Sequence, residues 1–364
     1  MNPQPTIGKK GRVLCVDDEP HVLRALQWLL QKDFEVHTAG SAQEGLALVA
    51  RHDFDVVVSD QRMPGTTGVE FLHAVREASP RAMRILLTGY SDLQAMVRSV
   101  NESEVYRFVT KPWDIRELPK VIGEAAAISR HAPAVPDEAP APALTPLGAS
   151  AAAPEVAARP TRVMMRPEES ILLIEDDEAV RATVREVLGP EVPVRYAANL
   201  AEAVHALAEH PASVVVSDVR VGKVDVTRLI RLLKAKHPEV VTVVFSGVQD
   251  ARVVMDLINQ GQVYRFIPKP FKPGFIRLII DSAIRRHRQL AQSPEARLRY
   301  GVESAGEEAS ESLRRDVERA AVAGLVPAAP GVALPAAAFA PGREDESQGF
   351  LQRISGGFRR LFGA

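Results

Sequence analysis

One phrase of unusual composition occurs twice in this chain, and the interval between the copies constrains the fold more than any other feature. VYRFVTKPW begins at Val105 and VYRFIPKPF begins at Val263, which are 158 residues apart (263 minus 105). Three further pairs recur at that interval: VVVSD from Val56 and Val214, LLTG and VFSG up to Gly89 and Gly247, and VDDE and IEDD from Val16 and Ile174. Solenoid repeats are much shorter, so the pattern predicts a duplicated domain.

The length and composition fit two globular domains. A chain of 364 residues allows two or three domains, and 46% hydrophobic with 25% charged residues is ordinary globular usage. The formal net charge of −1 comes from 45 basic and 46 acidic residues. Such a balance produces no strong field toward nucleic acid, so we expect no nucleic-acid partner.

The single cysteine and the N-terminal segment bear on the compartment. Cys15 lies within the apolar run RVLCV and has no partner for an intramolecular disulfide, which predicts a buried thiol in a reducing compartment. The start MNPQPTIGKKG has two lysines but no apolar segment behind it, and no apolar run is long enough to cross a bilayer. We therefore expect a cytoplasmic protein.

Each copy alternates short β-branched runs with amphipathic stretches. Runs such as VVVS and ILL are apolar at consecutive positions, as strands covered by helices on both faces are. The predicted strands are 12–16, 34–39, 55–59, 84–87 and 106–109, then 171–174, 194–197, 213–217, 242–245 and 264–267. Helix starts with capping-box spacing are Ser41 and Glu44, Asp114 and Glu117, and Asn199 and Glu202. Five successive βα units predict an α/β fold with two doubly wound, five-stranded parallel sheets.

The predicted domain boundaries follow the repeat. The first domain spans 11–130 and the second 169–290. Residues 131–168 between them are rich in Ala and Pro and are expected to form a disordered, semi-stiff linker. Residues 291–364 are expected to be a largely disordered tail with one helix and a terminal amphipathic segment at 350–362.

Two interpretations of the amphipathic segment FLQRISGGFRRLFGA stay open. Its apolar residues lie near helical spacing and its only charged side chains are arginines, which suits weak contact with a partner groove or an anionic membrane. Gly356 and Gly357 each cost about 1 kcal/mol in a helix, so the segment should be disordered when unbound. Alternatively, it is an unstructured tail or packs back on a domain.

The recurring motifs all fall at predicted strand ends. Asp17 and Asp18 follow the first strand, Asp60 the third, Thr88 ends the fourth and Lys111 follows the fifth. The carboxyl ends of parallel strands face one crevice, where three carboxylates would repel one another unless a cation joined them. Hard oxygen ligands suit Mg²⁺, which leaves an oxygen of Asp60 free to attack phosphorus. Lys111 would neutralise the transferred group and Thr88 would donate a hydrogen bond to it.

This constellation resembles the receiver domain of bacterial response regulators, which has a flavodoxin-like fold and accepts a phosphoryl group from a histidine kinase. In the first copy the resemblance implies the phosphoacceptor Asp60, the Mg²⁺ ligands Asp17, Asp18 and Asp60, the switch hydroxyl Thr88, the phosphate-binding Lys111, a cis bond to Pro112 and the switch aromatic Phe108. In the second copy it implies the phosphoacceptor Asp218, the Mg²⁺ ligands Glu175, Asp176 and Asp218, and then Ser246, Lys269, Pro270 and Phe266.

The second copy departs from the family pattern in one loop. QRMPGTTG follows Asp60, whereas VRVGKVDV follows Asp218, without the proline and with fewer glycines. In the family this loop supplies a backbone carbonyl to the metal. We favour a competent site at Asp218; the alternative is a pseudo-receiver used for docking or dimerisation.

The resulting expectation is a two-component response regulator with tandem receivers and no DNA-binding or enzymatic output. Its partners would be a histidine kinase or histidine phosphotransfer protein and a downstream protein that the sequence does not name, and the receivers could form a homodimer. Its only chemistry would be its own phosphorylation and dephosphorylation. The alternative is a scaffold with one or both receivers silent, anchored by the C-terminal segment. A cyclic-di-GMP phosphodiesterase is disfavoured because no His-Asp or Gly-Tyr-Pro signature follows.

Overall fold

The computed structural model describes residues 10–89, 93–131, 163–222, 224–247, 251–271, 273–300, 307–325 and 356–362. Most of the predicted linker 131–168 and residues 350–355 of the amphipathic segment lie outside these ranges. The chain forms two compact units: the first contains the first copy of the repeat together with 251–259 and 293–300, and the second contains the rest of the second copy and the later helices. No helix in the described ranges combines the length and apolar character that crossing a bilayer requires.

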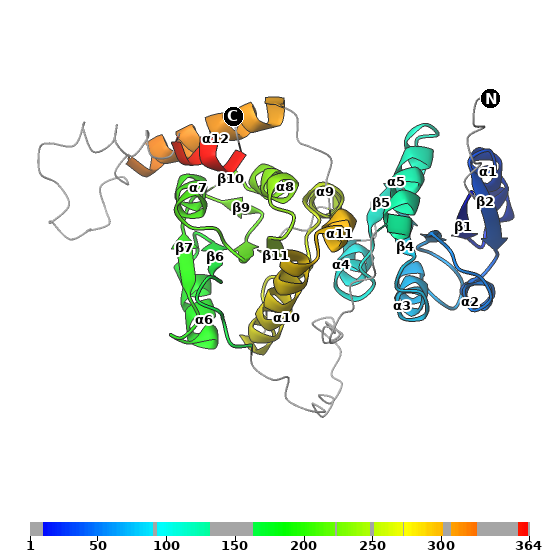
Figure 1. The fold of residues 1–364 in the computed structure, drawn as a ribbon, viewed down its shortest axis with the longest axis horizontal. Helices are drawn as coiled ribbons and strands as arrows, with labels where there is room; N and C mark the ends of the chain where they lie inside the picture. Colours follow the sequence, from blue (N-terminus) through cyan, green and yellow to red (C-terminus); the bar gives the residue numbers. More distant parts are fainter. Residues whose placement is uncertain are drawn as a thin grey trace, which may run out of the picture. The chain divides into compact units, whose positions relative to one another are not determined.

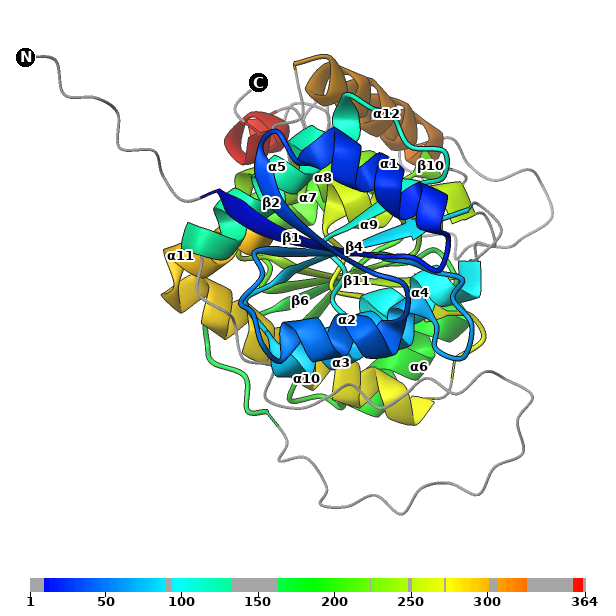
Figure 2. The same ribbon diagram turned by 90° about the vertical axis from the view of Figure 1, so that its right-hand side faces the viewer.

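The first unit contains a five-stranded parallel sheet in the order β2-β1-β3-β4-β5. Its elements are β1 (Gly11–Val16), α1 (Pro20–Leu30), β2 (Phe34–Ala39), α2 (Ala42–Val49), β3 (Val56–Asp60), α3 (Gly68–Ala78), β4 (Met83–Thr88), α4 (Leu93–Glu102), β5 (Arg107–Thr110) and α5 (Glu117–His131). Helices α1 and α5 cover one face of the sheet, and α2, α3 and α4 cover the other (Figure 2). The predicted doubly wound fold is confirmed.

The apolar runs form the centre of this sheet. Every residue of β3 and of β4 is buried, because helices cover both faces. Cys15 on β1 is completely buried in a cluster with Leu26 of α1, Ile85 of β4 and Ile122 of α5. The predicted buried thiol is therefore confirmed.

Side-chain caps fix the helix that follows β2 and the one that follows the Asp60 loop. The Ser41 hydroxyl accepts a hydrogen bond from the Glu44 N–H at 3.2 Å, as predicted, but the Glu44 carboxylate accepts from Gly40 rather than from the cap residue. A complete capping box joins Thr67 and Glu70 at the start of α3.

The second unit repeats the parallel sheet in the order β7-β6-β8-β11-β12. The elements of the second copy, in chain order, are β6 (Ile171–Ile174), α6 (Glu178–Leu188), β7 (Val194–Ala197), α7 (Leu200–Glu209), β8 (Val214–Ser217), β9 (Arg220–Val221), β10 (Val224–Asp225), α8 (Thr227–Lys236), β11 (Val241–Ser246), α9 (Ala251–Gly261), β12 (Arg265–Pro268) and α10 (Pro273–Gln292). Most of α9 groups with the first unit. Helices α6 and α10 lie on one face of this sheet and α7 and α8 on the other (Figure 1).

Strands β9 and β10 form an antiparallel pair that has no counterpart in the described loop after Asp60. The pair occupies the loop after Asp218, where Val219, Val221 and Val226 are buried. The sequence pattern indicated that this loop is unusual but did not predict strands in it.

Helical segments follow α10: α11 (Pro294–Arg297), a 3₁₀ helix (Leu298–Tyr300), α12 (Glu307–Leu325) and a last helix at 356–362. Helix α12 packs on α7 and α8 (Figure 1), burying Leu313 and Val317. Arg228 of α8 forms a 2.7 Å ion pair with Asp316 of α12.

The last helix, 356–362, belongs to the second unit. Phe358 and Phe362 are 1% and 3% exposed and contact each other, with ring centroids 4.9 Å apart. A Cβ on Gly357 would lie 2.6 Å from the Cβ of Ala208 on α7, so this glycine allows the two helices to approach. Of the interpretations left open for the amphipathic segment, the structure supports packing back on a domain for these residues.

Candidate functional site

The predicted site residues of the first unit gather at the carboxyl edge of its sheet. Asp17 follows β1, Asp60 is the last residue of β3, Thr88 is the last residue of β4 and Lys111 follows β5. The β1–β3 neighbourhood is where the strand order reverses direction, which is the position where open α/β sheets bind ligands.

Lys111 joins two of the carboxylates. Its Nζ donates a 2.7 Å hydrogen bond to Oδ2 of Asp17 and forms an ion pair with Oδ1 of Asp60. The other oxygens are held by the backbone, since Asp17 Oδ1 accepts from the Glu19 N–H at 2.9 Å and Asp60 Oδ2 accepts from the Arg62 N–H at 2.5 Å. The Lys111–Pro112 bond is cis, which confirms that prediction.

Burial sets the charge state of this site. Burial raises the pKa of Asp17, and its hydrogen bond with Lys111 only partly opposes the rise. Burial also works to lower the pKa of Lys111, but hydrogen bonds to Asp17 and Asp60 outweigh it, and the pKa is raised overall. Lys111 is therefore cationic at neutral pH, and a single ammonium serves two buried carboxylates.

The predicted switch residues of the first unit, Thr88 and Phe108, are buried. The Thr88 hydroxyl donates to the carbonyl of Gly89 at 3.2 Å, and no hydrogen bond between Thr88 and Asp60 is seen. Phe108 on β5 is 3% exposed. Thr88 therefore ends the strand next to that of Asp60, but its hydroxyl forms no hydrogen bond with Asp60.

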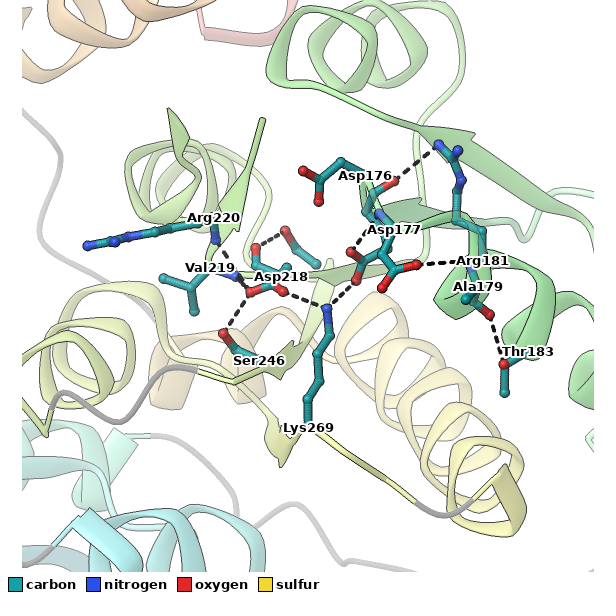
Figure 3. A network of polar contacts seen from close by, with 12 residues as sticks. Asp176, Asp177, Ala179, Arg181, Thr183, Asp218, Val219, Arg220, Ser246 and Lys269 are labelled. Atoms are coloured by element: carbon teal, nitrogen blue, oxygen red, sulfur yellow. Dashed lines mark hydrogen bonds and ion pairs between the residues drawn. The ribbon is translucent and has the colours of Figure 1, made fainter. Parts of the chain in front are cut away.

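The second unit repeats the lysine arrangement (Figure 3). Lys269 Nζ donates to Oε2 of Glu175 at 2.7 Å and to Oδ2 of Asp218 at 2.6 Å. Burial raises the pKa of Glu175, whereas hydrogen bonds to Asp218 and Glu175 overcome the effect of burial on Lys269 and raise its pKa. The Lys269–Pro270 bond is also cis, as predicted. Phe266 is 1% exposed.

The second site differs in the hydroxyl that was predicted to act as a switch. Ser246 Oγ donates a 2.6 Å hydrogen bond to Oδ1 of Asp218, in contrast to Thr88 in the first unit (Figure 3). The same Oδ1 accepts from the N–H groups of Val219 at 2.5 Å and Arg220 at 3.4 Å. Lys269 donates to the other oxygen, so the Asp218 carboxylate accepts hydrogen bonds from four donors.

The acidic residues after β6 have separate partners. Asp176 Oδ2 accepts a 3.0 Å hydrogen bond from the N–H of Gly222, which lies between β9 and β10. Asp177 caps helix α6 by accepting from the N–H of Ala179 at 2.8 Å. The extra acid of this motif is therefore a helix cap, as its position before α6 could have suggested.

The donor set is compatible with Mg²⁺, although it is not a closed metal site. Within the described ranges, no three Asp, Glu, His or Cys side chains lie close enough together to hold a metal ion. Mg²⁺ typically takes one or two carboxylates and keeps several waters, so Asp17 and Asp60 supply a sufficient set of hard oxygens. Asp18 is exposed beside them. The excess of negative charge over the single Lys111 ammonium also fits a divalent cation.

The family model for the response regulator receiver domain matches this chain twice, at residues 13–123 and 171–281. Together the two matches cover more than half of the chain. The chain is a member of the receiver-domain family of response regulators, with two tandem receivers.

The receiver similarity extends to curated bacterial regulators. The hydrogenase transcriptional regulatory protein HoxA of Cupriavidus necator is 46% identical over 105 residues, 29% of this chain and 22% of that protein. HoxA of Bradyrhizobium diazoefficiens is 36% identical over 121 residues, 33% of this chain and 25% of that protein. The regulatory protein AtoC of Escherichia coli is 34% identical over 116 residues, 32% of this chain and 25% of that protein. The similarity therefore spans at most a quarter of the length of these three relatives.

Two parts of the receiver sites were not anticipated from the sequence. The first is the tight contact of Gly68 with Asp60: a Cβ on Gly68 would lie 2.1 Å from the carbonyl oxygen of Asp60. The second is the bond from Gly222 to Asp176. Alignment of the two loops at the 158-residue interval shows that they differ in sequence, with Gly68 at the position of Val226, but does not predict either contact.

Proposed function

We propose that this chain is a response regulator that accepts a phosphoryl group from a histidine kinase or histidine phosphotransfer protein onto Asp60 and Asp218. The observation that carries the proposal is the bridging lysine, which binds an acidic residue after the first strand and the aspartate at or after the end of the third. A bridge built twice from positions far apart in sequence is hard to explain by stability alone, because burying several charges is costly.

The chemistry assigned to Asp60 is a nucleophilic displacement. One carboxylate oxygen forms a bond to phosphorus while the phosphorus–nitrogen bond of a phosphohistidine breaks, and the bonding electrons leave with the imidazole nitrogen. Lys111 stabilises the negative charge of the transferred group and the Arg62 N–H orients the carboxylate. When bound, Mg²⁺ would supply further charge neutralisation, held by one or two of the acids Asp17, Asp18 and Asp60 in the first receiver and by one or two of Glu175, Asp176 and Asp218 in the second.

The proposed output is a change in protein contacts. A phosphoryl group on Asp60 would attract the Thr88 hydroxyl away from Gly89, and Phe108 would move with it. Converting a population from 1:99 to 99:1 requires the phosphorylated state to favour the new arrangement by about 5.5 kcal/mol. The proposal assigns no turnover of other substrates, and the only reactions are gain and hydrolysis of the chain's own phosphoryl groups.

Phosphorylation of the full chain with Mg²⁺ and acetyl phosphate tests the proposal. Intact mass should increase by up to two phosphoryl groups in the wild type and by one in Asp60→Asn. The double variant Asp60→Asn, Asp218→Asn should gain none. Full labelling of the double variant would refute the assignment. Absence of labelling in the folded wild type, with phosphate-insensitive partner binding, would favour the scaffold alternative.

A further inference from the structure

The loops after the two acceptor aspartates have equal length but follow different paths. At the 158-residue interval, residues 61–68 correspond to 219–226, so that Gly68 corresponds to Val226. Gly68 approaches the Asp60 carbonyl oxygen so closely that a Cβ would lie 2.1 Å from it. Val226 carries a side chain, which is completely buried. The second loop therefore cannot follow the first path, and it forms β9 and β10 instead.

This different path brings backbone donors onto the acidic residues of the second site. The N–H of Gly222, at a φ of +57°, donates to Asp176 at 3.0 Å. The N–H groups of Val219 and Arg220 donate to the same oxygen of Asp218 that Ser246 binds. In the first site the corresponding loop donates only one of the described hydrogen bonds to Asp60, through Arg62, and the Thr88 hydroxyl bonds to Gly89.

Hydrogen bonds to a carboxylate stabilise its negative charge, so they lower its tendency to attack phosphorus and its need for a cation. A hydrogen bond to a charged group contributes about 1.5–3 kcal/mol, and each kilocalorie of ground-state stabilisation that the transition state lacks slows the reaction. The bond from Gly222 also engages an oxygen of Asp176, one of the acids predicted to hold Mg²⁺.

We propose that the β9–β10 hairpin and the residues before it supply backbone hydrogen bonds to the acidic residues of the second site. Asp218 then binds Mg²⁺ more weakly and accepts a phosphoryl group more slowly than Asp60. This inference rests on the proposed function of the two aspartates. The two receivers then respond to different strengths of the same input, with Asp60 filling first.

Single-acceptor variants of the full chain test the rate difference. Asp218→Asn leaves Asp60 and Asp60→Asn leaves Asp218, and each is treated with acetyl phosphate over a range of Mg²⁺ concentrations. We expect initial labelling of Asp218 to be at least about tenfold slower, which corresponds to about 1.4 kcal/mol in barrier height. Equal rates and equal Mg²⁺ dependence would overturn the inference while leaving the proposed function intact. Labelling of neither aspartate would instead refute the proposed function.

Mg²⁺ binding without phosphodonor provides an independent readout. The chain's two tryptophans are Trp28 and Trp113, and Trp113 follows the Lys111–Pro112 bond directly. The variant Trp28→Phe reports on the first site. The variant Trp28→Phe, Trp113→Phe, Phe271→Trp places the probe at the matching position of the second. We expect the fluorescence titration of the second site to need a higher Mg²⁺ concentration; identical titrations would contradict the proposal.

Replacing the second loop distinguishes the hairpin from other differences between the receivers. In Asp60→Asn, residues 219–226 are exchanged for QRMPGTTG, and folding of the second unit is checked by hydrogen exchange. If this variant folds, labelling of Asp218 should accelerate toward the rate of Asp60, and an unchanged rate would refute the role of the hairpin. If it does not fold, the single-acceptor rates and the Mg²⁺ titrations decide the question.

Discussion

Replacing Gly68 with Ala places a methyl group where the first receiver has no room for one. The added Cβ would lie 2.1 Å from the carbonyl oxygen of Asp60 and 2.8 Å from Cδ1 of Leu86. The first neighbour is backbone and cannot rotate away, so the loop or the end of β3 must move. Overpacking costs about 1–3 kcal/mol. The movement also weakens the 3.0 Å bond from the Gly68 N–H to Gln61, worth about 1 kcal/mol. We expect a loss of about 3 kcal/mol in unfolding free energy.

The assay uses the location of the tryptophans. Because both belong to the first unit, urea unfolding followed by tryptophan fluorescence reports on that receiver in the full chain. Phosphorylation of Asp60 should also slow by about a hundredfold, since a misplacement of about 1 Å can cost that much in rate. The matched control is Gly123→Ala in α5, where a new Cβ would meet nothing within 4 Å. It should stabilise by up to about 1 kcal/mol. Wild-type stability and labelling in Gly68→Ala would refute the packing argument.

Three further predictions concern the second unit and the buried thiol. Gly357→Ala should detach the last helix and increase hydrogen exchange in 356–362, because its Cβ would collide with Ala208. The control Gly356→Ala, whose Cβ has free space, should leave the exchange unchanged. Equal exchange in the two variants would refute the contact. Burial opposes ionisation of Glu169, but paired 2.7 Å bonds from Arg288, together with a 2.8 Å bond from the Arg166 N–H, outweigh it and lower its pKa. Glu169→Gln should therefore cost about 2 kcal/mol at pH 7, measured by hydrogen exchange of the second sheet. A carboxyl group whose pKa is lowered by folding stabilises the fold fully only at pH values above its unfolded-state pKa. The cost of Glu169→Gln should therefore shrink as the pH falls through the lowered pKa, and a cost that does not depend on pH would contradict the prediction. Burial raises the pKa of Cys15 to about 12, so a disulfide reagent at pH 8 should label it only at the rate of unfolding, and rapid labelling of the folded chain would contradict its burial.

The fold and the charged centre of each site could be predicted because they depend on local patterns. Consecutive apolar residues mark the buried strands, and the residues that end these strands must meet at one edge of a parallel sheet. The sequence could therefore predict that Asp17, Asp60 and Lys111 lie close together. The recurrence at a fixed interval strengthened each weak motif.

The remaining features depend on contacts between atoms distant in sequence or on close approach. The sequence QRMPGTTG does not predict that Gly68 lies against the Asp60 carbonyl. It therefore does not predict that Val226, at the matching position, requires a different loop. The choice of Ser246 to bond Asp218, while Thr88 bonds Gly89, depends on side-chain rotation. Gly357 was expected to weaken a helix, yet its missing side chain is what allows the helix to pack on α7.

The most direct test of the central claim is chemical identification of the modified residue. Borohydride reduces an aspartyl phosphate to homoserine, which peptide mapping by mass spectrometry locates. After treatment of the full chain with Mg²⁺ and acetyl phosphate, homoserine should be found at position 60, with a smaller amount at 218. Homoserine at other aspartates, or its absence at position 60 in folded protein, would contradict the account.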